Sequence, residues 1–422
     1  MRVWLLQTSE QLPVRDGVRK LRTRLLAEAL AARGHSVVWW ASCFNHLRKE
    51  WYFDRDTEFQ DGPALTVRAL KGFGYRRNVS LARFADHRRI ARKFSRAASR
   101  SLRPDLIVAS LPSHDLAEAA VRFARARGVP IIVDVRDKWP HNFLDAAPCS
   151  LRWLARIALA GEFRRTRNAL RGADAILSMT SPLLEWALQI ADRSAGPNDR
   201  VFYLGAYREL DGVVPSALRS LIESRLKGKC VVTFVGTFST YHNPEIALAV
   251  ARRFRDRPDI VFVLAGDGDL AEELRRRAAA LDNVVFTGWL ESAGIAALLG
   301  ASHLGLCTTG AKSERFFLPN KVFAYLAEGV PIASAFDGEL RDLIDQEKIG
   351  FNFRDEDELA GAIRSMAASA ELRRSLSDNA ARFFRSRCNA EVIYPQFVEH
   401  LERIAARRGV PSAGSATVPS LS

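Results

Sequence analysis

The sequence predicts an α/β protein with two domains, each an open, doubly wound parallel sheet covered by helices. The chain has 422 residues, more than one hydrophobic core usually organises, so two domains are expected. Short apolar runs alternate with helix-length amphipathic segments, which indicates parallel strands joined by helices. This alternation weakens at residues 205–228 and then resumes, so the chain contains two such series.

These observations set the expected limits of the domains. The first domain takes residues 1–204, a linker takes residues 205–228, and the second domain takes residues 229–378. Residues 379–408 are expected to be mostly helical. Residues 409–422 are small, polar and proline-containing, which is typical of a disordered tail.

The first domain opens with a strand, a polar loop, a helix and a second strand. The first strand is RVWLLQ, and the helix has one apolar face and ends at Gly34. The loop between them holds Gly17 and Arg19 just before the helix. A glycine lets a ligand approach and a helix start favours anions, so this loop is a candidate ligand contact. A flexible surface turn is the alternative.

Four further strands follow in the first domain, and the loops after them are where such a sheet binds ligands. The strands are DLIVAS, PIIVDV, ADAILSM and RVFYLG, and one long helix is expected at residues 151–170. The loops after DLIVAS and PIIVDV carry the polar candidates His114, Arg136, Asp137 and His141.

Three strands of the second domain end in glycine turns. Because parallel strands end at one edge of a sheet, these turns should lie together and present backbone to a ligand. A nucleotide fits such an edge, with phosphates near the first turn and the base near the third. The candidate contacts in the turns are Gly236, Thr237, Gly266, Asp267, Thr287, Gly288 and Trp289.

The segment Pro319-Asn320-Lys321 begins a helix at the same edge. Asn320 is expected to be the N-cap, which places Lys321 in the first turn, where the helix dipole is positive. A cation is unfavourable there unless an anion such as a diphosphate binds over the helix start. The alternative is a solvated lysine at an ordinary helix start.

The net charge of +14 lies in the first half of the chain. Residues 1–204 carry 35 Lys and Arg against 20 Asp and Glu, and the remainder is close to neutral. Such an excess indicates a nucleic acid, an anionic membrane or a phosphorylated substrate as partner. The densest part is a predicted helix, whose basic residues are Arg88, Arg89, Arg92, Lys93, Arg96 and Arg100. A solvated helix face is the alternative for this helix, and its few aromatic residues disfavour nucleic acid.

Composition indicates a cytoplasmic protein. No run is long and apolar enough to cross a membrane, and the five cysteines are scattered without the spacing of a zinc site or a disulfide framework. The D-x-D pairs at residues 54–56 and 267–269 lie in loops, where Asp tolerates unusual backbone angles. We therefore expect no metal site.

Motifs spread over nearly the whole chain resemble the GT-B glycosyltransferases of the retaining family 4 type, which use nucleotide sugars to build polysaccharides and glycolipids. The motifs are LAEALAARGHSV, VDVRDKWP, GADAILSMTSPL, FVGTF, LAGDGDL, NVVFTGWL, PNKVFAYLAEGVPI and SDNAARFFRSR. The resemblance implies two Rossmann-like domains facing across a cleft and a C-terminal helix that crosses back to the first domain. It also implies transfer with retention, without a metal or other cofactor.

The resemblance assigns the donor to the second domain. Lys321, together with Asn320, would hold the departing diphosphate of the donor, which we expect to be UDP-linked. Gly17 and Arg19 would close over the donor from the opposite domain.

The resemblance assigns the acceptor to the first domain. Arg136 and Asp137 would be catalytic groups, and His114 and His141 would lie on the acceptor side. An ion pair of Asp137 with Arg136 or Lys138 is the structural alternative.

Two features depart from the family pattern. The usual pair of glutamates, eight residues apart, falls on Phe316 and Ala324, so contacts to the ribose would come from elsewhere, with Glu314 and Glu328 as candidates. The basic pair after the first strand of the second domain is replaced by Ser239, Tyr241 and Asn243. The diphosphate would therefore depend more heavily on Lys321.

We expect a cytoplasmic hexosyl- or N-acetylhexosaminyltransferase at the inner face of the membrane. Its acceptor would be a lipid-linked sugar or a polysaccharide, and its basic half would contact the anionic membrane surface. A nucleotide-sugar-binding protein without catalysis and a nucleic-acid-binding protein are the alternatives.

Overall fold

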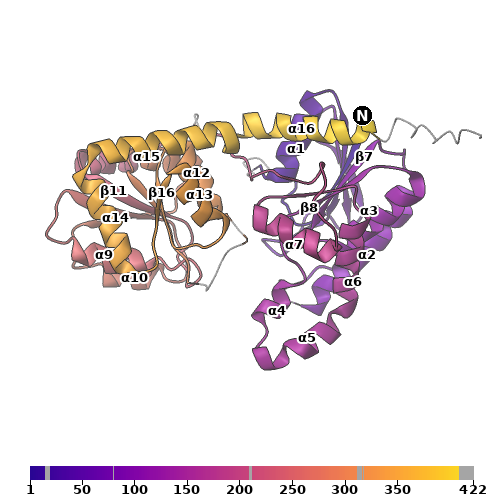
Figure 1. The fold of residues 1–422 in the computed structure, drawn as a ribbon, viewed down its shortest axis with the longest axis horizontal. Helices are drawn as coiled ribbons and strands as arrows, with labels where there is room; N and C mark the ends of the chain where they lie inside the picture. The colour runs from indigo at the N-terminus through magenta and orange to yellow at the C-terminus, as the bar shows by residue number, and fades with distance from the viewer. Residues whose placement is uncertain (15–19, 79, 209–211, 311–315, 317, 408–422) are drawn as a thin grey trace, which may run out of the picture. The chain divides into compact units, whose positions relative to one another are not determined.

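The computed structural model describes residues 1–14, 20–78, 80–208, 212–310, 316 and 318–407, and these form two compact α/β units (Figure 1). Unit 1 comprises Met1–Ser178, Leu183–Val201 and the end of the chain from Tyr394 onward. Unit 2 comprises Met179–Pro182 and Phe202–Ile393.

Unit 1 is organised around a sheet with the strand order β10-β9-β8-β7-β1-β2-β6-β5. Neighbouring strands in this sheet pair in parallel, except that β5 is antiparallel to β6. The strands are β1 (Arg2–Leu6), β2 (Ser36–Ser42), β5 (Thr57–Gln60), β6 (Leu65–Leu70), β7 (Leu106–Leu111), β8 (Ile131–Val135), β9 (Ala175–Ser178) and β10 (Arg200–Val201). A separate short hairpin pairs β3 (Phe44–Asn45) with β4 (Glu50–Trp51).

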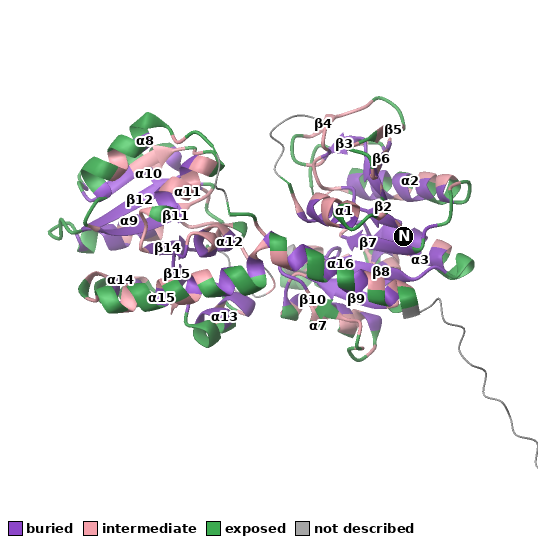
Figure 2. Cartoon of the chain, turned by 90° about the horizontal axis from the view of Figure 1, so that it is seen from above, coloured by how far each residue is buried: buried purple, intermediate pink, exposed green. Residues whose placement is uncertain are grey.

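Helices cover this sheet, and its strands other than β5 and β10 are buried along most of their length (Figure 2). The helices are α1 (Arg22–Ala32), α2 (Leu81–Ala98), α3 (His114–Arg127), α4 (Asn142–Ala146), α5 (Arg152–Ala158), α6 (Ala160–Gly172) and α7 (Ser181–Ala191), with a 3-10 turn η1 (Cys149–Leu151) before α5. The prediction of one long helix at residues 151–170 is wrong. The chain leaves helical angles at Leu159 (φ −100°, ψ 7°), so α5 and α6 are separate helices.

The C-terminal helix α16 (Ala390–Arg407) returns the chain to unit 1, as predicted. The Glu402 carboxylate lies 2.6 Å from the Arg33 guanidinium and 2.8 Å from the His35 ring. The Arg22 guanidinium of α1 lies 4.9 Å from the centre of the Phe397 ring. These contacts fix α16 against α1.

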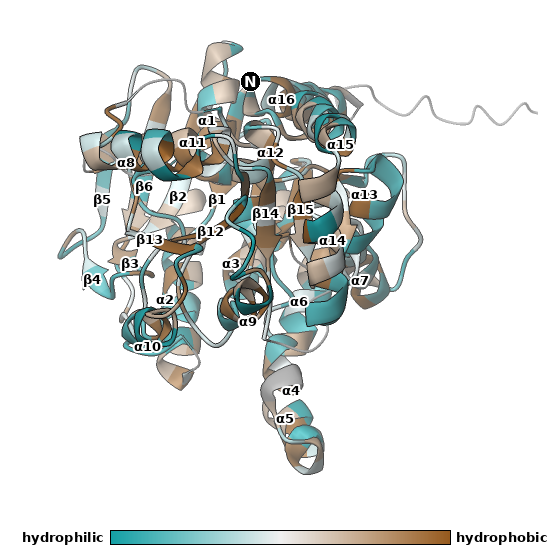
Figure 3. Cartoon of the chain, turned by 90° about the vertical axis from the view of Figure 1, so that its left-hand side faces the viewer, coloured by the Kyte–Doolittle hydropathy of each residue, from teal (hydrophilic) through white to brown (hydrophobic). Residues whose placement is uncertain are grey.

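Unit 2 contains a fully parallel sheet with the order β13-β12-β11-β14-β15-β16. The strands are β11 (Cys230–Val235), β12 (Ile260–Ala265), β13 (Val284–Gly288), β14 (Leu304–Cys307), β15 (Ile332–Ser334) and β16 (Gly350–Asn352). They are apolar, whereas the surrounding helices carry hydrophilic residues (Figure 3). The helices are α8 (Ser216–Leu221), α9 (Glu245–Arg253), α10 (Ala271–Arg277), α11 (Ser292–Gly300), α12 (Asn320–Ala327), α13 (Glu339–Glu347), α14 (Glu356–Ala368) and α15 (Ala370–Phe383), with short π-helical turns η2 (Ile222–Leu226) and η3 (Phe384–Cys388). The predicted pair of doubly wound sheets is confirmed.

None of the described helices combines the length and apolarity that a bilayer-spanning segment requires. All five cysteines are free, and Cys149 is the exposed one.

Candidate functional site

The glycine turns after β11, β12 and β13 lie side by side in unit 2. The Gly236 amide donates to the Ala265 carbonyl at 2.9 Å, and the Gly266 amide donates to the Gly288 carbonyl at 2.9 Å. The three strands are neighbours in the sheet, so the turns share its carboxyl edge. This is the arrangement that parallel strand order predicts for a ligand-binding edge.

Two of these turns require glycine for steric reasons. Gly266 has φ +148°, and a Cβ on it would lie 1.9 Å from the Gly236 carbonyl oxygen. Gly236 has φ +142°, and a Cβ on it would lie 3.2 Å from Lys321 Nζ. The backbone of both turns is therefore bare, and the Lys321 ammonium lies directly beside the first turn.

Helix α12 begins at Asn320, and its N-cap is Pro319. The prediction that Asn320 is the N-cap is therefore wrong by one position. Pro319 has extended angles (φ −59°, ψ 140°), and no side chain caps the helix. Lys321 still lies in the first turn, where backbone N–H groups lack intrahelical partners.

The Lys321 ammonium is buried rather than solvated. Its Nζ atom lies 3.8 Å from the centre of the Phe234 ring and has no hydrogen-bond partner among the described residues. Burial lowers the pKa of Lys321 to about 8, and the nearby Cys307 thiol opposes this shift. Burial in turn raises the pKa of Cys307 to about 12, so that thiol is neutral at neutral pH. A buried cation without a counter-charge is costly, so an anion bound here would be strongly stabilised.

Tyr325 attaches α12 to the ends of the strands. Its hydroxyl accepts from the Val235 amide at 3.0 Å and donates to the Leu306 carbonyl at 3.1 Å. Gly305 makes room for the ring, since a Cβ there would lie 2.6 Å from it. Sequence reasoning missed Tyr325, Phe234 and Cys307. The helical spacing of Tyr325 from Lys321 is the one signal that connects them.

The remaining candidate donor contacts surround this edge. Thr237, Asp267, Trp289 and Asn320 are exposed, and Thr287, Gly288 and Pro319 are half-buried. The Asp267 carboxylate accepts from the Gly268 amide at 2.9 Å. Trp289 is 67% exposed, and its Nε1 donates to Glu291 at 3.1 Å. An exposed indole beside the third turn offers a flat apolar surface to a base.

Phe316, which replaces a family glutamate, and the candidate ribose contact Glu328 both contact other residues of this chain. The Phe316 carbonyl accepts from the Thr180 hydroxyl at 2.8 Å. Glu328, a candidate ribose contact, lies 3.1 Å from the Arg208 guanidinium and is committed to that ion pair. Glu314, Gly17 and Arg19 lie outside the described residues.

Arg136 belongs to a buried ion network in unit 1. Its Nε donates to Asp134 at 2.7 Å, and another nitrogen contacts Glu10. Arg22 binds the same Asp134 carboxylate at 2.9 Å. Burial alone would raise the pKa of Asp134, but Arg22 and Arg136 lower it. Arg136 therefore fixes β8 to its neighbours.

Asp137 directly follows this network. Its carboxylate accepts from Asn142 Nδ2 at 2.5 Å. Burial raises the pKa of Asp137, and this outweighs the opposing effects of Asn142, Lys138 and Arg83. The ion pair with Arg136 is not formed, because Arg136 binds Asp134 and Glu10. His141 lies near Asp137 in sequence, and its ring packs 4.6 Å from the centre of Phe163.

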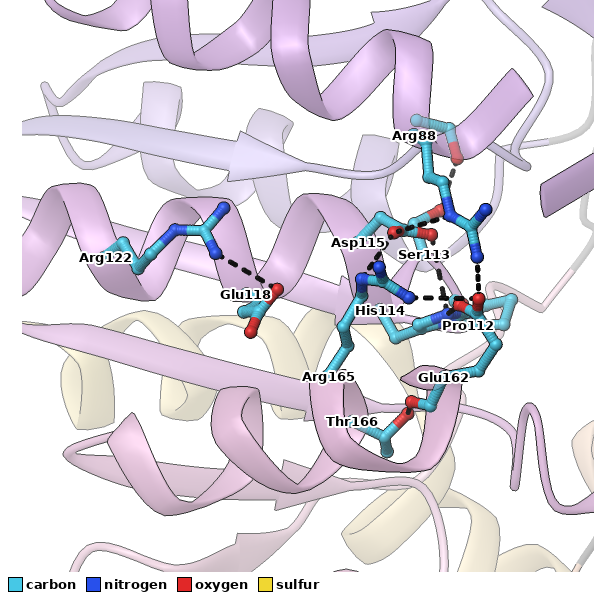
Figure 4. A network of polar contacts seen from close by, with 11 residues as sticks. Arg88, Pro112, Ser113, His114, Asp115, Glu118, Arg122, Glu162, Arg165 and Thr166 are labelled. Atoms are coloured by element: carbon cyan, nitrogen blue, oxygen red, sulfur yellow. Dashed lines mark hydrogen bonds and ion pairs between the residues drawn. The ribbon is translucent and has the colours of Figure 1, made fainter. Parts of the chain in front are cut away.

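His114 is enclosed in a second ion network (Figure 4). Its Nε2 lies 2.6 Å from Glu162, while Arg88 and Arg165 contact both Glu162 and Asp115. His114, Asp115 and Glu162 form the one group of three possible metal ligands within the described ranges. The two arginines already neutralise its carboxylates, so the arrangement is that of an internal ion network joining α2, α3 and α6.

Two protein families match this chain, one in each part. The family described as "Glycosyl transferases group 1" matches residues 229–369, and the "Glycosyl transferase 4-like domain" matches residues 20–206. No curated protein sequence matches the chain.

Several solved structures share the fold. Sucrose-phosphate synthase from Thermosynechococcus elongatus has a TM-score of 0.70 and 19% identity, covering 96% of this chain and 99% of that one. Anabaena HepE in complex with UDP has a TM-score of 0.65 and 16% identity, covering 96% and 100%. A trehalose-6-phosphate synthase, OtsA, has a TM-score of 0.67 and 12% identity, covering 96% and 99%. The likeness at these identities is one of fold, and the matched families establish the relationship: the chain belongs to the GT-B glycosyltransferases of the group 1, GT4-like family.

Proposed function

We propose that the protein transfers a hexose from a UDP-linked donor to an acceptor hydroxyl, with retention of configuration and without a metal ion. The observation that carries this proposal is the buried, unpaired Lys321 ammonium beside the bare Gly236 turn. A diphosphate supplies the missing negative charge. The choice of UDP-glucose as the first donor to test is supported by HepE, which has the same fold and has been solved in complex with UDP-glucose.

The proposed reaction places the largest charge change at Lys321. The bond between the sugar C1 and the diphosphate oxygen breaks, and UDP leaves with its electron pair. The acceptor oxygen forms the new bond on the same face of C1, and its proton passes to the departing phosphate. A preorganised ammonium and the N-terminus of α12 stabilise the charge on the leaving group.

The remaining donor contacts are proposed from the same edge. Thr237 and the Gly236 and Gly266 backbone would approach the phosphates, and residues 287–289 would contact the base. Asp267, Pro319 and Asn320 would line the donor, with Gly17 and Arg19 contributing from the N-terminal loop.

On the acceptor side, we assign Asp137 the direct role. Its buried carboxyl with a raised pKa suits a group that contacts an incoming hydroxyl. Arg136 would position Asp137 through the Asp134 network, and His141 would complete the surface. His114 would support this surface from the protein interior, because its ring is fully buried.

The proposed acceptor is lipid-linked or a glycan, presented at an anionic membrane. The exposed basic residues of α2 are Arg89, Arg92 and Arg96, and the exposed Arg100 follows just after the helix. Arg88 is excluded from this surface, because it is held in the ion network with Glu162 and Asp115.

The function is tested by a thermal-shift panel of nucleoside diphosphates and their sugars, followed by a UDP-release assay. UDP compounds should stabilise the wild type and a Lys227→Met control, whose side chain is 75% exposed, but not Lys321→Met. No response to any nucleotide would contradict a donor site.

A noncatalytic nucleotide-sugar-binding protein is the second candidate, because Phe316 and Ala324 replace the acidic pair of the family. Stabilisation by UDP-sugars without UDP release, in the presence of lipid-linked and glycan acceptors, would establish that role instead.

A further inference from the structure

The segment at residues 148–158, which we call the α5 tip, exposes apolar side chains next to one another. It consists of Pro148, the turn η1 and helix α5. Its large apolar residues and their exposed fractions are Leu151 (51%), Trp153 (63%), Leu154 (51%) and Ile157 (65%). No residue of α5 is buried. Other exposed large apolar residues of the described chain are scattered, which is normal for a surface, whereas a contiguous set indicates an interaction site.

The tip is held at both ends by packed helices. In α4, which precedes it, Phe143 packs 4.5 Å from Trp139 and 5.5 Å from Phe84, measured between ring centres. In α6, which follows it, Thr166 and Leu170 are fully buried. Figures 1 and 3 show α4 and α5 projecting from the end of α6, away from the sheet of unit 1. The apolar residues are thus presented on a fixed projection.

The charges around the tip are positive. Residues 146–161 contain no Asp or Glu, and Arg152 and Arg156 are exposed within α5. Neither guanidinium has a carboxylate within ion-pair distance in the described part of the chain. Arg164 and Arg167 extend the exposed positive charge along α6. A surface that carries apolar side chains and unpaired arginines together matches an anionic lipid bilayer.

The residue types favour a bilayer over a protein partner. Tryptophan prefers the membrane-water interface, and arginines can insert their apolar stems while the guanidinium stays at the headgroups. Helix α5 has seven residues, or about 10 Å of length, which is enough to lie in the headgroup region but not to cross it.

We infer that the α5 tip inserts into the headgroup region of an anionic membrane and anchors unit 1 there. This inference rests on the proposed function, because the α5 tip would hold unit 1 at the membrane that presents the acceptor. It adds an apolar contact, made by Leu151, Trp153, Leu154 and Ile157, to the electrostatic attraction of the α2 arginines.

The test is flotation of the full chain with vesicles of phosphatidylcholine and phosphatidylglycerol, and with phosphatidylcholine alone. The variant combines Trp153→Ser, Leu154→Ser and Ile157→Ser. The matched control combines Leu47→Ser, Leu81→Ser and Leu102→Ser, which removes three apolar residues that are at least as exposed elsewhere in unit 1. The tip variant should bind anionic vesicles at least about tenfold more weakly, and the control should bind like the wild type.

A fluorophore on Cys149 gives a second readout at the tip itself. Cys149 is exposed and the other four cysteines are buried, so labelling is selective. Emission of an environment-sensitive label should shift to shorter wavelength on addition of anionic vesicles, and less so with phosphatidylcholine alone.

Two results would overturn the inference. One is unchanged vesicle binding in the tip variant. The other is a concentration-dependent dimer of the wild type that the tip substitutions abolish while vesicle binding persists, which would make the tip an interface between two copies of the chain. UDP-dependent stabilisation, measured on the same variant, reports separately on the proposed function, because the substituted residues belong to unit 1 and the diphosphate edge to unit 2.

Discussion

The Nζ atom of Lys321 lies 3.8 Å from the centre of the Phe234 ring, and no described group accepts a hydrogen bond from it. The aromatic face offers partial compensation for the ammonium charge but no formal counter-ion. The ligand-free protein therefore holds a buried cation at a cost in stability, and an anion that binds there removes that cost.

This arrangement predicts that the ligand-free protein becomes more stable as pH rises from about 8 toward 10.5. The pKa of Lys321 is lowered in the folded state, so the unfolded chain binds more protons in this window and stability rises with pH. The gain is roughly 3 kcal/mol at most. Urea unfolding of the wild type and Lys321→Met across this range measures it. The difference between the two proteins should shrink as pH rises, and a constant difference would contradict the assignment.

Gly236→Ala should destabilise unit 2 and weaken UDP binding. The residue has φ +142°, and the new Cβ would lie 3.2 Å from Lys321 Nζ. Backbone strain at such angles costs about 1–3 kcal/mol. Gly228→Ala is the matched control, because Gly228 has φ +75° but open space around it. That control should lose about 1 kcal/mol and keep the full thermal response to UDP.

Tyr325→Phe should loosen α12. The substitution leaves the Val235 amide and the Leu306 carbonyl without their side-chain partner, at a cost of about 1–3 kcal/mol. Because the same helix carries Lys321, calorimetry should also show weaker UDP binding. A variant with wild-type stability in urea would show that Tyr325 does not secure the helix.

Glu162→Gln should remove part of the acid sensitivity of unit 1. Burial opposes ionisation of Glu162, but the hydrogen bond with His114 and the charges of His114, Arg165 and Arg88 lower its pKa to about 2. A lowered carboxyl pKa contributes stability above the unfolded value of 4.5, and this is lost as pH falls toward 2. After allowance for solvent screening the contribution is roughly 2 kcal/mol. Acid unfolding monitored by circular dichroism measures it, with Glu118→Gln, which removes the ion pair with the exposed Arg122, as control.

The arginines of α2 should divide into two groups. Arg88→Gln should lower stability, because Arg88 bridges Glu162 and Asp115. Arg92→Gln and Arg96→Gln should leave stability unchanged and each weaken binding to anionic vesicles about fivefold at low salt. Thermal unfolding and vesicle flotation, run on all three variants, separate these effects. Equal effects of the three substitutions on stability and on vesicle binding would show that the α2 arginines do not divide into these two groups.

Sequence patterns alone predict that the glycine turns of unit 2 lie together at the carboxyl edge of its sheet. Apolar runs that end at Gly236, Gly266 and Gly288 identify strands, and parallel order brings their ends together. The same reasoning placed Lys321 at a helix start. It did not reveal the burial of the ammonium, because Phe234 and Cys307 come from separate strands and become neighbours only in the sheet.

Short sequence patterns gave wrong or incomplete predictions where backbone geometry or a residue distant in sequence determines the structure. Asn320 is a good capping residue, but Pro319 takes that position, and Leu159 interrupts a continuous helical pattern. The enclosure of His114 depends on Glu162, 48 residues away, which no local spacing indicates. The domain limits at residues 204 and 228 and the roles of the candidate site residues stay predictions.

The central claim is that Lys321 holds the diphosphate of the donor. Isothermal titration of UDP into the wild type, Lys321→Met and Lys227→Met at neutral pH tests it most directly. The account predicts that Lys227→Met binds like the wild type and that Lys321→Met loses at least about tenfold in affinity, since a charge-assisted contact in a buried site is worth about 1.5–3 kcal/mol. Equal UDP affinity in all three proteins would contradict it.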